Sequence, residues 1–306
     1  MRWLPTLLLT LVGFPLNAFG QDQGFDDSIL LSNTIIASSQ SYQIKKLGCE
    51  FAGIFSRGNM ESKNGHLTIE AKSEGGGFHC GHALDQNSLI LGVSGNIQQF
   101  TMDAIVFRRE ELTTNYQPYL AFQLSPSFSL GISQEMETGE YKTQTGSYSA
   151  SSHRLLLSGT WHQDQWEATV AYADRYRDTM VPTIDIPRSM DLSVRYQFSP
   201  LLTTAVTYTR YDFPGIANGS PLTVETSTTL VLASRITDEL ATELALIQTK
   251  NVEGDPKAKS QTIGFMGRYA LNQQFKVGGF VHQYKGDSPD FDTNMSVYGF
   301  SLSMDR

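Results

Sequence analysis

The chain has 306 residues, of which 40% are hydrophobic and only 18% are charged, and it contains 26 Gly, 17 Phe and 13 Tyr. This composition argues against a disordered chain, and two cysteines are too few for a disulfide-dense scaffold. The formal net charge of −8 argues against a general nucleic-acid binder, because no basic surplus is present to neutralise phosphates. We therefore expect a folded, acidic, aromatic-rich protein that does not bind nucleic acid.

The first twenty residues have the three-part pattern of a secretory signal peptide. Arg2 supplies the positive charge, residues 3–16 are apolar and uncharged, and Ala18-Phe19-Gly20 gives small residues before the cleavage point. The apolar stretch is shorter than the ~20 residues that a helical membrane anchor needs. We predict cleavage after Gly20, which leaves residues 21–41 as an N-terminal segment ahead of the first strand.

Apolar residues alternate with polar or small residues along most of the chain after the signal. In the run 189–198, Leu192, Val194 and Tyr196 share one face, and Ser193 and Arg195 share the other. Side chains of a strand point alternately to the two faces of a sheet, so this pattern predicts β-strands with one apolar and one polar face. The same alternation occurs in the runs 166–174, 202–209, 260–271 and 274–285.

The breaks between runs are alternately short and long. Short joints occur at 125–127, 162–165, 199–200, 236–238 and 272–273. Longer polar segments with Gly, Pro, Asn and Asp are predicted at 137–152, 175–188, 212–223, 250–258 and 286–293. This alternation is typical of a closed antiparallel meander whose two rims differ.

These features resemble the outer-membrane β-barrels of Gram-negative bacteria, which have short periplasmic turns, long outer loops and aromatic girdles. The final strand, Tyr298-Gly299-Phe300-Ser301-Leu302-Ser303-Met304, is similar to the C-terminal signal that barrel-assembly machinery reads, although Met304 and Arg306 depart from it. The resemblance implies an all-β, closed, up-and-down transmembrane barrel in the outer membrane, with both termini periplasmic. A secreted β-sandwich or β-helix, with its apolar face in its own core, is the alternative.

The strand count stays between 12 and 16. Twelve runs extend from 99–107 to the C-terminus, and four weaker candidates precede them at 47–57, 65–73, 77–84 and 88–94. The barrel is predicted over 42–306, with 42–97 either part of its wall or a plug or periplasmic element.

If the apolar faces contact lipid, the charged residues between them must point inward, because Lys or Arg facing hydrocarbon costs about 2–4 kcal/mol at the midplane. The residues expected to face lipid are Tyr172, Val194, Val206, Phe265, Val277 and Phe300. The residues expected to line a pore are Arg154, Glu167, Arg195, Glu243, Arg268, Lys276 and His282. Inward charges of both signs either line an aqueous pore or pair with one another in a narrow lumen.

The remaining chemistry is sparse. Cys49 and Cys80 are the only cysteines, and in an oxidising compartment we expect them to form a disulfide. The alternative is a metal site formed by Cys49 with His79, Cys80 and His82, and Asp287, Asp290 and Asp292 are a second candidate, for Ca²⁺. His153 and Arg154 beside Ser151 and Ser152 are the nearest local candidates for a hydrolase site, but no nucleophile motif surrounds them.

The sequence therefore predicts a protein that is not an enzyme and holds no cofactor or metal. Its favoured function is a porin-like channel for passive passage of small hydrophilic solutes or ions. The alternatives are a structural or interaction barrel, either an adhesin or a subunit of an export complex, and more remotely a barrel hydrolase. The expected partners are outer-membrane lipid and the barrel-assembly machinery, with a homo-oligomer as a further option.

Overall fold

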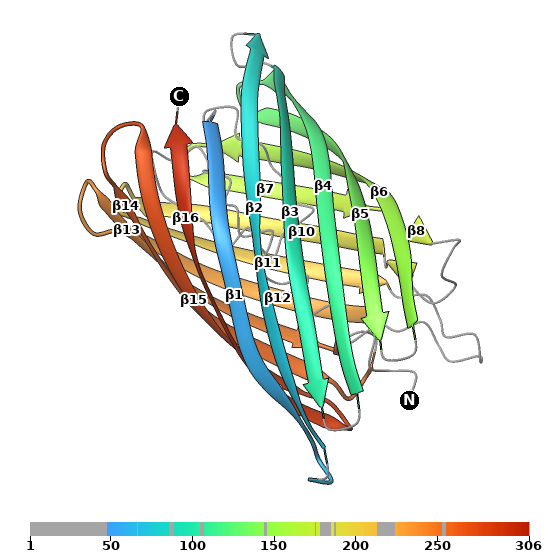
Figure 1. Cartoon of the computed structure of the whole chain (residues 1–306). Coiled ribbons are helices and arrows are strands. Elements are labelled where there is room, and N and C mark those ends of the chain that lie inside the picture. Colours follow the sequence, from blue (N-terminus) through green and yellow to red (C-terminus); the bar gives the residue numbers. More distant parts are fainter. Residues whose placement is uncertain are drawn as a thin grey trace.

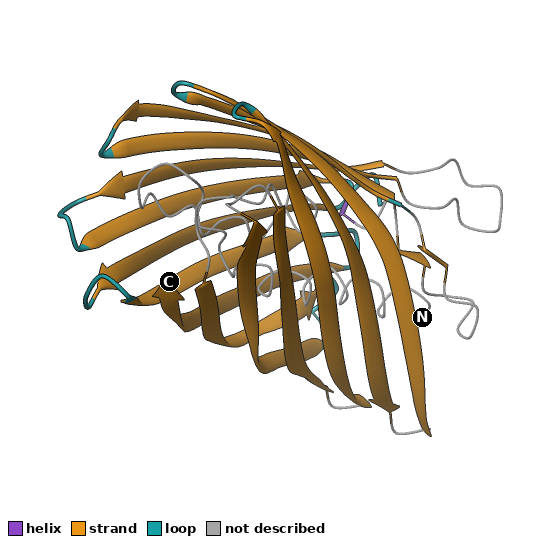
Figure 2. Cartoon of the chain, turned by 90° about the horizontal axis from the view of Figure 1, so that it is seen from above, coloured by secondary structure: helices purple, strands orange, loops and turns teal. Residues whose placement is uncertain are grey.

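The computed structural model describes residues 48–65, 67–85, 89–104, 107–143, 146–174, 176–177, 185–186, 188–212, 224–252 and 255–305. The predicted signal peptide and the segment 21–41 lie outside these described residues. Within the described part of the chain, fourteen strands close into one antiparallel barrel, which agrees with the predicted fold class (Figures 1 and 2). They are β1 (Gly48–Ser62), β2 (Thr68–Asp85), β3 (Leu89–Ala104), β4 (Phe107–Ser125), β5 (Phe128–Thr143), β6 (Gly146–Gln163), β7 (Trp166–Ala173), β10 (Arg188–Ser199), β11 (Leu202–Asp212), β12 (Val224–Arg235), β13 (Leu240–Lys250), β14 (Lys259–Ala270), β15 (Phe275–Asp287) and β16 (Phe291–Asp305).

Each strand pairs with its neighbours in sequence, and β1 closes the barrel against β16. The separate two-residue strands β8 (Tyr176–Arg177) and β9 (Asp185–Ile186) pair with each other between β7 and β10. Gly48 pairs with Asp305, so the first and last strands begin and end at the same rim, which we call the terminal end. The opposite rim is called the far end. Strands β1–β6 form the near wall in Figure 1, and β7 and β10–β14 cross behind them.

The barrel has its apolar residues outside. Val206 is 46% exposed and its strand neighbour Thr207 is 3% exposed, because adjacent residues point to opposite sides of the wall. All six residues expected to face lipid are exposed on the outer side: Tyr172, Val194, Val206, Phe265, Val277 and Phe300. A soluble barrel would bury these side chains, whereas a bilayer provides the apolar surroundings that they need.

The strand boundaries differ from the sequence-based expectation in the first third of the chain. The predicted runs 65–73 and 77–84 are one strand, β2, and the runs 88–94 and 99–107 overlap largely with β3. Residues 48–62, 68–85 and 89–104 are therefore strands of the barrel wall. The long polar segment predicted at 137–152 is wrong, because β5 and β6 pair along it from Glu137 with Ser152 to Thr143 with Gly146. The segment predicted at 286–293 is likewise a short turn between Asp287 and Phe291.

The closing seam between β1 and β16 is reinforced at the far end. The Lys63 amide donates to the Asp290 carbonyl at 3.0 Å, and the Lys63 ammonium pairs with Asp287 and Asp292. Lys259 also reaches Asp287, at 3.3 Å. The hydrogen bonds from Lys63 and Lys259 lower the pKa of Asp287, and the bond to Asp287 raises the pKa of Lys63. Among the described residues, no helix is long and apolar enough to cross a bilayer.

Candidate functional site in the barrel lumen

All seven residues expected to line a pore lie on the inner side of the wall. Each occupies a strand position between outward-facing residues, and each side chain is buried or nearly buried. They come from β6, β7, β10, β13, β14 and β15, so they surround the lumen rather than gather at one point. The geometry therefore agrees with the inward orientation expected for Arg154, Glu167, Arg195, Glu243, Arg268, Lys276 and His282.

The inward arginines are paired with carboxylates. Arg268 Nη2 lies 2.8 Å from Glu50 Oε1 across β14, β15, β16 and β1, and Arg195 Nη1 lies 3.4 Å from Glu167 Oε1 on the neighbouring strand. Arg154 pairs with Glu135 on β5. Because a buried charge without a partner is very costly, these pairs account for charged side chains at fully buried positions. The charges of these arginines are therefore compensated within the protein.

A wall of hydroxyl groups lines the lumen along β10–β14. Thr207 Oγ1 donates to Ser193 Oγ at 3.0 Å, and Thr249 Oγ1 donates to Ser227 Oγ at 3.1 Å. These two hydrogen bonds join short side chains on adjacent strands, whereas Thr262 Oγ1 on β14 has no hydrogen-bond partner within the described residues. The hydroxyl wall consists of Ser193, Thr203, Thr207, Thr209, Ser227, Thr229, Thr249 and Thr262.

An apolar mouth lies inside the barrel at the far end, on the side formed by β1–β3, β15 and β16. Here the alternation is inverted: Asn59 and Glu61 point outward, and Met60 between them is fully buried inside. On β3, Thr101 and Asp103 likewise point outward and flank the buried Met102. The apolar mouth comprises Met60, Ile69, Ala71, Phe100, Met102, Tyr284 and Met295.

The apolar surface continues towards the terminal end. Val297 is the next inward residue after Met295 on β16, and it packs with Ile54, Met266 and Phe280. This inner apolar cluster ends at Arg268, which is two residues beyond Met266 on β14 and pairs with Glu50. An apolar track therefore runs from the far end to a buried ion pair.

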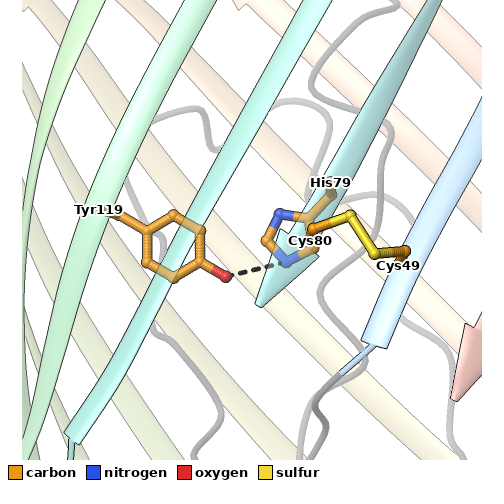
Figure 3. The surroundings of a disulfide bond; sticks show 4 residues. All are labelled: Cys49, His79, Cys80 and Tyr119. Atoms are coloured by element: carbon orange, nitrogen blue, oxygen red, sulfur yellow. Dashed lines mark hydrogen bonds between the residues drawn. A yellow bond between two sulfur atoms is a disulfide. The ribbon is translucent and has the colours of Figure 1, made fainter. Parts of the chain in front are cut away.

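The two cysteines form a disulfide between β1 and β2 on the outer side of the wall, as expected for Cys49 and Cys80 (Figure 3). His79 points inward beside them, and its Nε2 shares a 3.1 Å hydrogen bond with Tyr119 Oη. The Tyr119 ring is stacked on His79 and lies over Gly92, where a Cβ would collide with it.

The alternative sites predicted from sequence are not assembled. The disulfide takes both sulfur atoms from the proposed metal site, and His79 and His82 face opposite sides of β2. Asp287 and Asp292 contact Lys63 rather than form an open cation site. His153 and Arg154 also point to opposite sides of the wall. Among the described residues, no group of three or more His, Cys, Asp and Glu is arranged to hold a metal ion.

The sequence matches no protein-family model. It also matches no curated protein. Solved structures do match. The deltaS2 mutant of the TodX monoaromatic hydrocarbon channel gives a TM-score of 0.74 at 10% identity, covering 96% of this chain and all of that chain. A Pseudomonas aeruginosa FadL homologue gives 0.66, and the P. putida toluene transporter TodX gives 0.64; each is 10% identical and covers 85% of this chain and 90% of its own. This similarity concerns the fold, which is that of a transmembrane β-barrel.

Sequence reasoning placed Glu167 inside with Arg195 but missed the apolar mouth and the carboxylate partners of Arg154 and Arg268, which are Glu135 and Glu50. The sequence does contain a signal for the apolar mouth. In β2 the apolar residues occupy odd-numbered positions before Gly75–Gly77 and even-numbered positions after it. Similarly, Asp191 lies between Met190 and Leu192, and alternation alone would have placed it inside with Arg195. The pairing of Arg268 with Glu50 had no sequence signal, because 218 residues separate them.

Proposed function

We propose that the protein is an outer-membrane transport barrel that admits small apolar or amphipathic molecules at its apolar mouth. The observation that carries this proposal is the inverted alternation at the far end. Polar residues there cover the outer surface, and the apolar side chains on the inner side of the wall pack together as the buried cluster of the apolar mouth. Concave apolar surfaces with a few polar groups are typical of sites for small molecules. In the proposed orientation of the barrel in the outer membrane, the terminal end faces the periplasm and the far end faces the outside of the cell.

The similar structures support this substrate class. Two of them are described as a toluene transporter and a monoaromatic hydrocarbon channel. They are transport proteins, so the comparison favours transport over catalysis for this chain. Insertion by the barrel-assembly machinery is part of the proposal, because the last strand resembles the signal that this machinery reads.

Passive passage of small hydrophilic solutes or ions is the second candidate. The hydroxyl wall along β10–β14 favours it, since hydroxyl groups offer hydrogen bonds to water and sugars. The ion pairs weigh against it, because Arg195 and Arg268 are already neutralised by Glu167 and Glu50. Paired charges bias the passage of ions less than unpaired charges along the path would.

The test is uptake of radiolabelled naphthalene by Gram-negative cells that express the wild type or Met102→Gln. Met102 is fully buried in the mouth, and glutamine preserves its length while adding a polar amide. Burying an apolar side chain is worth about 1.5–3 kcal/mol, so we expect uptake to fall about tenfold. Thr101→Gln is the matched control, because Thr101 points outward on the same strand.

Equal uptake in cells with and without the barrel would overturn the apolar assignment. Steady ion conductance in a planar bilayer, unchanged by Met102→Gln, would then support the hydrophilic channel.

A further inference from the structure

An acidic wall faces the lumen on strands β4, β5, β10 and β12. In the described residues it brings together five carboxyl groups with the guanidinium groups of Arg109, which pairs with Glu111, and Arg154, which pairs with Glu135. Direct register pairs place Glu135 opposite Arg154 and Tyr211 opposite Glu225. The carboxylates of the acidic wall belong to Glu111, Glu135, Glu137, Asp191 and Glu225.

Electrostatic contacts join these residues into one group. Glu137 interacts with Glu135, Arg154 and Glu111. Tyr211, which lies between β10 and β12, interacts with Asp191, Glu225 and Arg154. The wall therefore continues around the lumen from β4 to β12 as one group of interacting acidic side chains.

Asp191 is buried on the inner side of β10 within this wall. It is 1% exposed, and neither carboxylate oxygen has a hydrogen bond within the described structure. Thr209 faces it from β11, but at a geometry that leaves both oxygens unsatisfied. Arg154 acts on it from farther away, while its guanidinium group hydrogen-bonds to Glu135. A buried carboxylate in this position lacks a cation or an N–H donor.

We propose that the acidic wall around Asp191 binds the ammonium group of small amphipathic amines. An ammonium group offers a positive charge and three donors, which match the unsatisfied oxygens of Asp191 and the hydroxyl of Thr209. This inference rests on the proposed transport of amphipathic molecules and assigns the charge that such molecules carry.

The experiment measures binding by titration calorimetry to the full barrel in nanodiscs, with empty nanodiscs subtracted. The probes are benzylammonium, benzyl alcohol and benzoate, which share a ring and differ in charge. A hydrogen bond to a charged group contributes about 1.5–3 kcal/mol, so we expect the wild type to prefer benzylammonium over benzyl alcohol by about tenfold or more. Benzoate should bind most weakly.

Asp191→Asn should abolish the preference for benzylammonium, because it keeps the shape of the side chain and removes its charge. Glu225→Gln should reduce the preference and serves if Asp191→Asn does not fold. The matched control is Asp212→Asn, which removes a negative charge from the outer surface, where Asp212 pairs with Arg210. Asp212→Asn should leave the preference unchanged.

Two results would overturn the inference. One is equal affinity of the wild type for benzylammonium and benzyl alcohol, which would mean that Asp191 is satisfied by a proton alone. The other is a preference that survives in both Asp191→Asn and Glu225→Gln. Failure of naphthalene uptake together with retained, Asp191-dependent binding of benzylammonium would instead reject the proposed apolar transport and keep the amine site.

Discussion

The buried ion pairs make individual lumen residues important for folding. Arg268→Gln would leave Glu50 charged at a position where it is 5% exposed. Removing one partner of a buried pair typically costs about 3–5 kcal/mol, because the other charge stays uncompensated. We expect Arg268→Gln to lower the free energy of unfolding by about 3 kcal/mol in a urea titration in lipid vesicles.

The double variant Glu50→Gln/Arg268→Gln is the control, since it removes both charges together. It should recover most of the lost stability. A single variant as stable as the wild type would show that Glu50 has other compensation. Because Arg195 and Arg268 are paired with carboxylates, stability is the first property that their loss should change.

Contact with lipid also determines the stability cost of single substitutions on the outer face. Val206→Arg places a guanidinium group in the apolar belt and should cost about 2–4 kcal/mol in the same titration if Val206 lies near the midplane. Tyr208→Arg lies two residues closer to Arg210, which already carries a charge on that face near the far end. Its cost should be smaller, because the penalty falls towards the interface. Equal costs at both positions would argue against a bilayer around this face.

At the scale of elements, the disulfide joins β1 and β2 beside the closing seam. The bond spans 31 residues, for which loop entropy predicts about 3.7 kcal/mol of stabilisation. We therefore expect Cys49→Ser/Cys80→Ser to unfold at lower temperature, as measured by the heat-dependent mobility shift on a gel. Reduction of the wild type should reproduce this change, and an unchanged transition in both cases would mean that the strand pairing alone holds the seam.

The turns at the far end respond to pH through Asp287. Its pKa is lowered by hydrogen bonds from Lys63 and then Lys259, so the contact is present above about pH 4 and is lost as the pH falls through the lowered pKa. The pKa of Lys63 is raised, so its contribution is lost only at strongly alkaline pH. We expect a carboxyl NMR titration of Asp287 to have its midpoint below the ordinary value, and Lys63→Met to raise it. A midpoint that Lys63→Met leaves unchanged would contradict this contact.

The elements also show which parts of the fold can be predicted from sequence. Strands β10–β16 were predictable because apolar residues occupy every second position along the lipid-facing segment of each strand. Strands β2 and β3 were not predicted as single strands. Their apolar residues point outward in the lipid-facing part of the wall and inward beyond it, so the alternation changes within each strand. In β2 this change occurs at Gly75–Gly77, so one strand of 18 residues had the pattern of two short ones.

For the whole molecule, the inward orientation of seven charged residues followed from the cost of exposing charge to lipid. What they do inside the lumen did not follow. Pairs such as Arg268 with Glu50 depend on barrel closure, which brings β14 and β1 to nearby parts of the wall. The apolar mouth likewise exists only because β1 meets β16, which places Met60 near Met295.

The two halves of the lumen surface differ in chemistry. The apolar mouth occupies the far-end part of β1–β3, β15 and β16, whereas the inner side of β10–β13 carries more hydroxyl groups and carboxylates, together with the apolar cluster Ala205, Val231, Ala233 and Ala245. This difference is the reason for proposing molecules with an apolar body and one polar group as substrates, in place of fully hydrophilic solutes. This asymmetry is the central claim of the account.

Anomalous diffraction from crystals grown with 4-bromotoluene tests this claim most directly, because it locates one bromine atom without reference to transport rates. We predict a bromine peak inside the barrel, in van der Waals contact with Phe100 and Met295. A peak confined to the outer lipid-facing surface, or one beside the hydroxyl wall at Thr207 and Thr229, would contradict it.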